Sequence, residues 1–209
     1  EYQARMIEEG SVRTIQKLLQ TGNSNTMRYL CGVALTYLAN CRASRKTMVD
    51  QRVTATLVSL AENGNELTRT GVLIAFYRLS MCEESRETMV NEGAVSILIK
   101  LAGNSCKNAK PLCTSALYHF SSSEPSRTLM LVGSLDEVIP AVIKLATDDD
   151  HRTQRNCAMI LANWLVLEAS HDRLIAAGVI ETLVSLSKGA SEVARDWAAV
   201  ALYNLSCRP

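Results

Sequence analysis

The residues that could perform chemistry in this chain are few and lie far apart. The three histidines are His119, His151 and His171, and no HExxH, Cys-x-x-Cys, Walker or GxGxxG pattern occurs in the sequence. Such patterns bring metal ligands together or place backbone amides around a phosphate. The sequence therefore predicts a protein that is not an enzyme and that uses no cofactor and no metal.

The charged residues also argue against a metal or nucleic-acid site. The run Asp148–Asp150 resembles a metal cluster only superficially, because aspartates before a helix are an ordinary start signal favoured by the helix dipole. Arg152, Arg155 and Arg195 could form only a local basic patch, since 22 Lys+Arg nearly balance 21 Asp+Glu at a net charge of +1. This balance favours neither nucleic acid nor an anionic membrane as a partner.

The elements that would position any site follow from an internal repeat. A five-residue motif, exemplified by Ala-Leu-Tyr-Asn-Leu, recurs with an apolar pair first and an apolar residue last. Its copies begin at Ala34, Ala75, Ala116, Ile160 and Ala201, at steps of 41, 41, 44 and 41 residues. A fixed period in the low forties is typical of stacked helical units. The repeat predicts an all-α fold whose function is surface recognition.

Each unit is expected to begin with a short helix. A serine starts this helix, and its hydroxyl is expected to accept hydrogen bonds from the free N–H groups of the first turn. These serines are Ser44, Ser85, Ser126 and Ser170. In three units a left-handed glycine is expected to end the helix. These glycines are Gly10, Gly93 and Gly178, whereas Arg52 and Ser134 hold the same place elsewhere and predict turns of a different build.

A second and a third helix are expected to complete each unit. The second carries an apolar doublet and a closing leucine, as in Leu98-Ile99-Lys100-Leu101. Pro140 is expected in the first turn of such a helix, and the three extra residues of the 44-residue step are expected between the first two helices of unit four. The third helix has about 16 residues and ends with the motif, as its apolar spacing indicates.

Three of the seven cysteines share one buried position of the repeat, and the set does not indicate a disulfide framework. Cys31, Cys113 and Cys157 share one repeat position, which Val72 and Ala198 fill in the other units. A position that accepts Cys, Val or Ala is a small buried slot. Reduced thiols predict the cytoplasm, with the nucleus as a second compartment. No apolar run is long enough to span a bilayer, and the first residues lack a signal-peptide pattern.

The repeat resembles the armadillo repeat. Three helices per unit, a 41-residue step and a third helix ending Ala-Leu-x-Asn-Leu carry the resemblance, and segments 91–101 and 176–186 are similar to the family's junction of first and second helices. It covers about residues 2–207 and implies one right-handed α-solenoid of about five three-helix repeats. Their expected bounds are 1–41, 42–82, 83–123, 124–168 and 169–209. A two-helix HEAT array is the alternative, against which the short first helix argues.

The resemblance also implies a binding surface. In this family the third helices line a concave face, and an Asn near the end of each holds the backbone of an extended peptide. This place, the fourth residue of the motif, is here called the ladder position. Asn163 and Asn204 match the family pattern, whereas Tyr37, Arg78 and His119 interrupt it in units one to three.

The helical period extends the expected binding face beyond the ladder positions. Residues four and seven before each ladder residue share its face. The full set is Leu30, Val33, Tyr37, Gly71, Ile74, Arg78, Leu112, Ser115, His119, Asn156, Met159, Asn163, Trp197, Val200 and Asn204. The principal site is expected in units four and five, where Trp197 supplies an aromatic anchor. Two alternatives stay open, namely a core role for Trp197 and bonds from the two Asn to neighbouring helices.

The opposite side of the third helices is expected to form the core. Its members are the second and fifth motif residues, Leu35, Phe76, Leu117, Leu161, Leu202 and, among the closing residues, Trp164. The predicted function is a protein–protein interaction scaffold that binds an extended peptide or a partner helix in the concave groove. The alternative is a structural or spacer element of a larger assembly, cytoskeletal or ciliary for example, that uses its end faces or convex surface.

The expected partner is a protein or a peptide, with no nucleic acid and no membrane. The chain shows no distinct polar capping helix, which solenoid ends usually need. This predicts a fragment of a longer array, or self-association or continuation of the array through an end face.

Overall fold

The computed structural model describes residues 2–22, 24–103, 109–133, 135–189 and 191–207. Within these ranges the regular elements are fifteen α-helices and three short 3₁₀ helices, with no strand. The predicted all-α fold is therefore confirmed. The chain divides into two compact units, residues 1–104 and 105–209, and the boundary falls inside the third expected repeat. The division into five repeats with the bounds given above stays a prediction.

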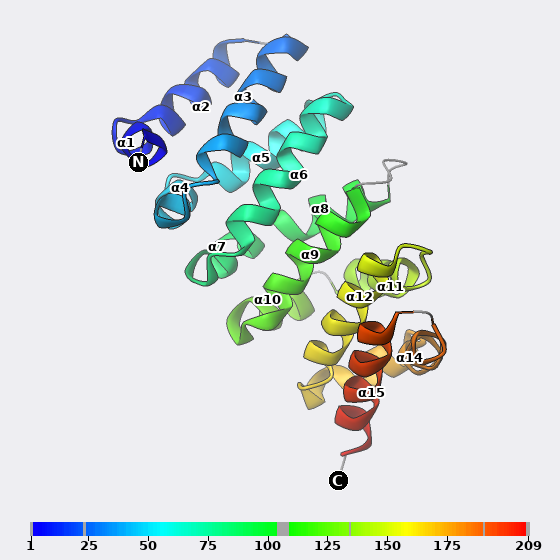
Figure 1. Ribbon diagram of the computed structural model, residues 1–209. Helices are drawn as coiled ribbons and strands as arrows, with labels where there is room; N and C mark the ends of the chain where they lie inside the picture. The colour runs from blue at the N-terminus through cyan, green and yellow to red at the C-terminus, as the bar shows by residue number, and fades with distance from the viewer. Residues whose placement is uncertain (1, 23, 104–108, 134, 190, 208–209) are drawn as a thin grey trace. The chain divides into compact units, whose positions relative to one another are not determined.

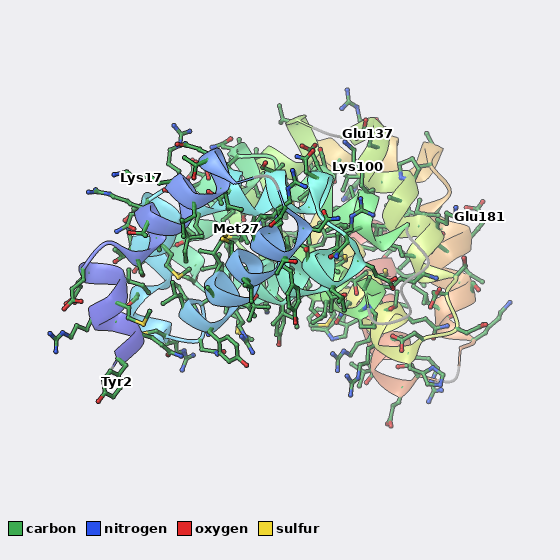
Figure 2. All side chains as sticks on the ribbon, turned by 90° about the horizontal axis from the view of Figure 1, so that it is seen from above. Tyr2, Lys17, Met27, Lys100, Glu137 and Glu181 are labelled. Carbon is green, nitrogen blue, oxygen red and sulfur yellow. The ribbon has the colours of Figure 1, made fainter. Side chains whose placement is uncertain are left out.

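The first unit contains eight α-helices in a recurring order of short, medium and long. They are α1 (Tyr2–Glu8), α2 (Ser11–Thr21), α3 (Asn25–Leu38), α4 (Arg45–Asp50), α5 (Val53–Asn63), α6 (Glu66–Ser80), α7 (Arg86–Asn91) and α8 (Ala94–Ala102). The long helices α3 and α6 lie side by side, and α5 packs beside α8 in a second layer (Figure 1). Lys17 on α2 and Lys100 on α8 point into solvent, as does Tyr2 on α1 (Figure 2).

The second unit repeats this order. Its helices are α9 (Ala109–Ser122), α10 (Glu124–Gly133), α11 (Leu135–Ala146), α12 (His151–Trp164), α13 (His171–Ala176), α14 (Val179–Ser187) and α15 (Glu192–Ser206). The long helices α9, α12 and α15 stack in one layer, with α12 in the middle, and α11 packs beside α14 (Figure 1). The short 3₁₀ helices Arg42–Ser44, Glu83–Ser85 and Glu168–Ser170 precede α4, α7 and α13.

The predicted core positions are buried in both units. Leu35, Phe76, Leu117 and Leu161 have no exposed surface, and neither has Trp164, whose core role is thus confirmed. The slot shared by Cys, Val and Ala is buried as predicted, with exposed fractions of 4% or less at all five of its positions. Leu202 on α15 is only half-buried. The apolar period of the third helices is therefore a packing pattern, as the sequence indicates.

The turns before the second helices are more uniform than the sequence predicts. Gly10, Gly93 and Gly178 are left-handed, with φ of 90°, 88° and 88°. Arg52 adopts the same region, with φ of 60°, so the expectation of a different turn there is wrong. A non-glycine residue in this region is disfavoured by about 1–2 kcal/mol, which the surrounding helix ends must offset. Ser134 lies outside the described residues.

The predicted serine caps are wrong. Where the structure assigns a cap to α4, α7 and α13, the serine accepts no hydrogen bond from the helix it precedes. Ser170 Oγ instead donates to the carbonyl of Trp164 at 2.7 Å, and Ser126 Oγ donates to that of Phe120. The reason is that the chain enters these short helices already in a helical turn, which leaves the hydroxyl facing the end of the preceding long helix.

The residue after each serine has a related role that the sequence reading missed. Its side chain bonds to a carbonyl near the end of the long helix six residues earlier. The pairs are Arg45 Nε to Ala39 O at 3.0 Å, Arg86 Nε to Ser80 O at 2.9 Å, Arg127 Nη1 to Ser121 O at 3.3 Å, and His171 Nε2 to Leu165 O at 2.8 Å. Positive groups are favoured there because the last carbonyls of a helix lack partners.

The 44-residue step of the sequence repeat has a simple origin in the structure. Helix α11 begins seven residues before Val142 of its apolar doublet, whereas α8 and α14 begin four residues before Leu98 and Leu183, the matching residues. The three extra residues therefore lengthen the second helix rather than the connection before it. Pro140 consequently lies inside α11, not in its first turn, and that expectation is wrong.

Candidate functional site

A groove lies between α3 and α6, on the long helices of the first unit. Its volume is about 370 Å³. Its lining residues are Tyr29, Val33, Thr36, Tyr37, Leu67, Thr70, Gly71, Ile74 and Arg78. All of them come from α3 and α6, and this set defines the α3/α6 groove. Five of the nine belong to the face that the sequence assigned to binding.

Two glycines lie where α3 and α6 meet beneath this groove, and each leaves room for a Cβ in ordinary contact. A Cβ on Gly71 would lie 3.6 Å from Thr36 Oγ1, and one on Gly32 would lie 3.7 Å from Thr68 Cγ2. Thr36 Oγ1 donates to the Gly71 carbonyl at 2.8 Å and also lies 2.8 Å from its own helix at Gly32 O. Because Thr36 bridges both helices, the floor is held in one geometry.

The rim of the groove combines exposed apolar side chains with one cation. Tyr37 is 63% exposed and Leu67 is 64% exposed. Arg78 is half-buried, and its Nη1 donates to the Thr36 carbonyl at 2.8 Å. Large exposed apolar groups beside a fixed guanidinium are characteristic of binding surfaces.

In the second unit the two ladder asparagines contact the preceding long helix. Asn163 Nδ2 donates to Ser121 Oγ at 3.0 Å, and Asn204 Nδ2 donates to the Ala162 carbonyl at 3.3 Å. Both bonds match the alternative that these amides tie neighbouring helices together. An amide has two N–H donors and an acceptor oxygen, so each bond uses only part of its capacity. Both side chains are half-buried and reach the surface.

The other expected groove residues of this unit are placed unequally. Val200 is 43% exposed, and Trp197, Met159 and His119 are half-buried. These four thus retain surface on the side where the sequence expected a partner.

Asn156 corrects the expected site. It is only 2% exposed, and its Nδ2 lies 2.8 Å from Ser115 Oγ and 3.1 Å from Thr114 Oγ1. A buried amide must find such partners, and these lie across the interface of α12 and α9. Asn156 is therefore a buried inter-helix contact, and it is not available to a partner.

Several groove residues were missed from the sequence, although a signal for them existed. Tyr29, Thr70 and Leu67 lie eight or eleven residues before their ladder residue, one further turn along the same face. These residues lie beyond the seven-residue span from which the binding face was predicted. Thr36 was missed because it precedes a ladder residue directly and reaches the groove only where two helices meet.

The ionisable groups were also compared with the needs of a metal centre. Among the described residues no group of three or more His, Cys, Asp or Glu side chains could hold a metal ion. Asp150 accepts from the Thr153 N–H at 2.8 Å, so the acidic run is the helix start signal that was predicted. Lys110 donates to Asp148, which lowers the pKa of that carboxyl. In the described part of the chain, none of the helices combines the length and apolarity that crossing a bilayer requires.

Among the comparisons with known proteins, the one with solved structures supports the fold. No family model and no curated protein sequence matches the chain. Its structure is similar to that of computationally designed armadillo repeat proteins for modular peptide recognition, with a TM-score of 0.83 and 20% identity over 96% of this chain and 84% of that one. The chain has an armadillo-type repeat fold. A designed armadillo repeat protein in complex with the peptide (KR)4 is also similar, with a TM-score of 0.80 and 18% identity over 96% of this chain and 84% of that one.

Proposed function

We propose that this protein is a non-enzymatic scaffold that binds an extended peptide segment of a partner protein on its long helices. The observation that carries the proposal is the α3/α6 groove, which long-helix residues alone line and whose rim exposes Tyr37 and Leu67. Aromatic and arginine side chains in a preformed concavity are frequent anchors of protein partners. The designed armadillo proteins that resemble this chain include one in complex with a peptide, which supports the same kind of ligand.

We extend the proposal to the long helices of the second unit. There Asn163 and Asn204 keep unused amide groups that could pair with a peptide backbone whatever its side chains. Trp197, Val200 and Met159 would supply apolar contacts beside them. Each unit would thus offer its own recognition surface.

A peptide-array screen with the full chain tests the proposal. Selective capture of extended peptides, lost on replacement of exposed long-helix residues such as Leu67, is the expected outcome. Capture of a folded partner alone, with no peptide retained, would contradict it.

A structural role in a larger assembly is the second candidate, favoured by the apolar surface of α14 and α15. Ile180 is 39% exposed, Val184 is 38% exposed and Tyr203 is 67% exposed. Leu202 is half-buried, although its counterparts Leu35, Phe76, Leu117 and Leu161 are fully buried. Such a surface suits packing against another helical repeat or a second copy of the chain.

A further inference from the structure

We propose that the α3/α6 groove selects an extended segment that carries an apolar side chain and, about three residues away, a carboxylate. The inference rests on the proposed peptide-binding function and names the partner class for one of its two surfaces. The apolar side chain would lie over Gly71, and the carboxylate would pair with Arg78. The occupant is thus an acidic, partly apolar stretch of another protein.

The middle of the groove suits an apolar side chain. Val33 and Ile74 are half-buried walls, and Tyr29 and Leu67 stand exposed on the rim. The two threonine hydroxyls of the lining already have partners within the protein: Thr70 Oγ1 donates to Glu66 O at 3.0 Å, and Thr36 Oγ1 contacts two carbonyls. An entering apolar group therefore leaves neither threonine hydroxyl without a hydrogen-bond partner, and it removes apolar surface from water.

One end of the groove is positively charged. Among the described residues no acidic side chain lies within ion-pair distance of Arg78 or Arg42. The Arg78 guanidinium at this end of the lining favours a carboxylate, which guanidinium binds with two parallel hydrogen bonds.

The groove is prepared for this ligand before it binds. Arg78 Nη1 is fixed on the Thr36 carbonyl at 2.8 Å, which leaves its Nε and Nη2 donors for a ligand. Thr36 in turn joins α3 to α6 through the Gly71 carbonyl. A side chain that is already ordered loses little conformational freedom on binding, which favours affinity.

The spacing of the two ligand groups follows from helix geometry. Gly71 and Arg78 are two turns apart on α6, which at the helical rise corresponds to about 10 Å. An extended peptide advances about 3.3 Å per residue, so roughly three residues cover that distance. The preferred segment therefore places its acidic residue about three positions from its apolar one.

Fluorescence anisotropy with three short fluorescein-labelled peptides and the full chain tests the proposal. In a Gly/Ser background, the acidic probe carries Phe and Glu about three residues apart. The basic probe has Lys for Glu, and the polar probe has Ser for Phe. We expect the acidic probe to bind at least about tenfold more tightly than the other two.

Two variants make the test specific. Arg78→Glu should reverse the preference, so that the basic probe becomes the tighter ligand by charge exchange. Arg13→Glu is the matched control, because it makes the same charge change at an exposed position of α2, outside the groove. It should leave the preference unchanged. If Arg78→Glu unfolds the chain in circular dichroism, Arg78→Gln keeps an N–H donor for Thr36 O and should weaken the acidic probe alone.

The outcomes separate this inference from the proposed function. Tighter binding of the basic probe, or an unchanged preference in folded Arg78→Glu or Arg78→Gln protein, would overturn the inference. Capture of other array peptides with no response to Arg78→Glu and Leu67→Ser would overturn it too, while leaving the peptide-binding function in place. If neither the probes nor any array peptide binds, both proposals fail.

Discussion

Asn204 holds the ladder position of α15 and uses one N–H group on the Ala162 carbonyl. We expect Asn204→Ala to lower the free energy of unfolding by roughly 0.5–1.5 kcal/mol, because one hydrogen bond is lost. Peptide affinity should fall by about 1–3 kcal/mol, because the amide groups that would pair with a peptide backbone are lost as well. Urea unfolding and anisotropy titration measure the two quantities.

The exposed Asn63 on α5 provides a matched control for Asn204. It donates to the Ser59 carbonyl at 3.0 Å, so Asn63→Ala removes the same kind of bond away from the long helices. Equal losses of affinity in the two variants would contradict a ligand contact by Asn204.

A Trp197→Ala variant tests the same face of α15. Lost affinity in a folded protein is expected, and global unfolding would place Trp197 in the core.

Arg45 supports the end of α3 and provides a second prediction at the residue scale. It is 7% exposed, and its Nε donates to the Ala39 carbonyl. We expect Arg45→Ala to lower the free energy of unfolding by about 1–3 kcal/mol, because a buried acceptor loses its partner. Exposed Arg42 makes a matched comparison, and Arg42→Ala should stay within about 0.5 kcal/mol of the parent. Urea unfolding decides, and similar losses in both variants would refute a capping role.

At the scale of elements, Gly64 and Gly71 should respond in opposite ways to replacement by alanine. Gly71→Ala should stabilise the protein by up to about 1 kcal/mol, because Gly is a poor residue in a helix interior and the new Cβ would make only ordinary contacts. Gly64→Ala should destabilise it, because its Cβ would collide with the Leu60 carbonyl and Thr68. Thermal melts of both variants test the pair, and equal shifts in Tm would contradict this difference in space.

The helices could be predicted from the sequence because each one buries its own apolar stripe. The motif period placed Leu35 and Trp164 in the core without knowledge of any neighbour. Contacts between units could not be predicted in this way. Asn156 appeared to face a partner, yet the hydroxyls of Ser115 and Thr114 on α9 draw it into an interface. Arg52 shows the same limit, because its left-handed turn is imposed by the helices it joins.

At the scale of the whole chain, the proposed recognition groups are spread over repeats rather than gathered at one centre. In the first unit they are aromatic, aliphatic and cationic, and in the second they are amides beside Trp197. Because each repeat contacts mainly its neighbours, such surfaces can change independently within one fold. This explains why the fold was easier to predict than the ligand.

Exposed apolar residues on α14 and α15 lead to a last prediction, at the scale of the whole molecule. Val184 and Tyr203 lie on two packed helices, and their exposure leaves apolar surface in water. We expect the chain to associate as its concentration rises, because burying such surface is favourable by about 25 cal/mol per Å². Sedimentation velocity should show Val184→Lys and Tyr203→Lys shifting the chain towards monomer. Val132→Lys, at a 77% exposed site on α10, should leave association unchanged. A parent chain that stays monomeric at every concentration would show that this surface does not mediate self-association.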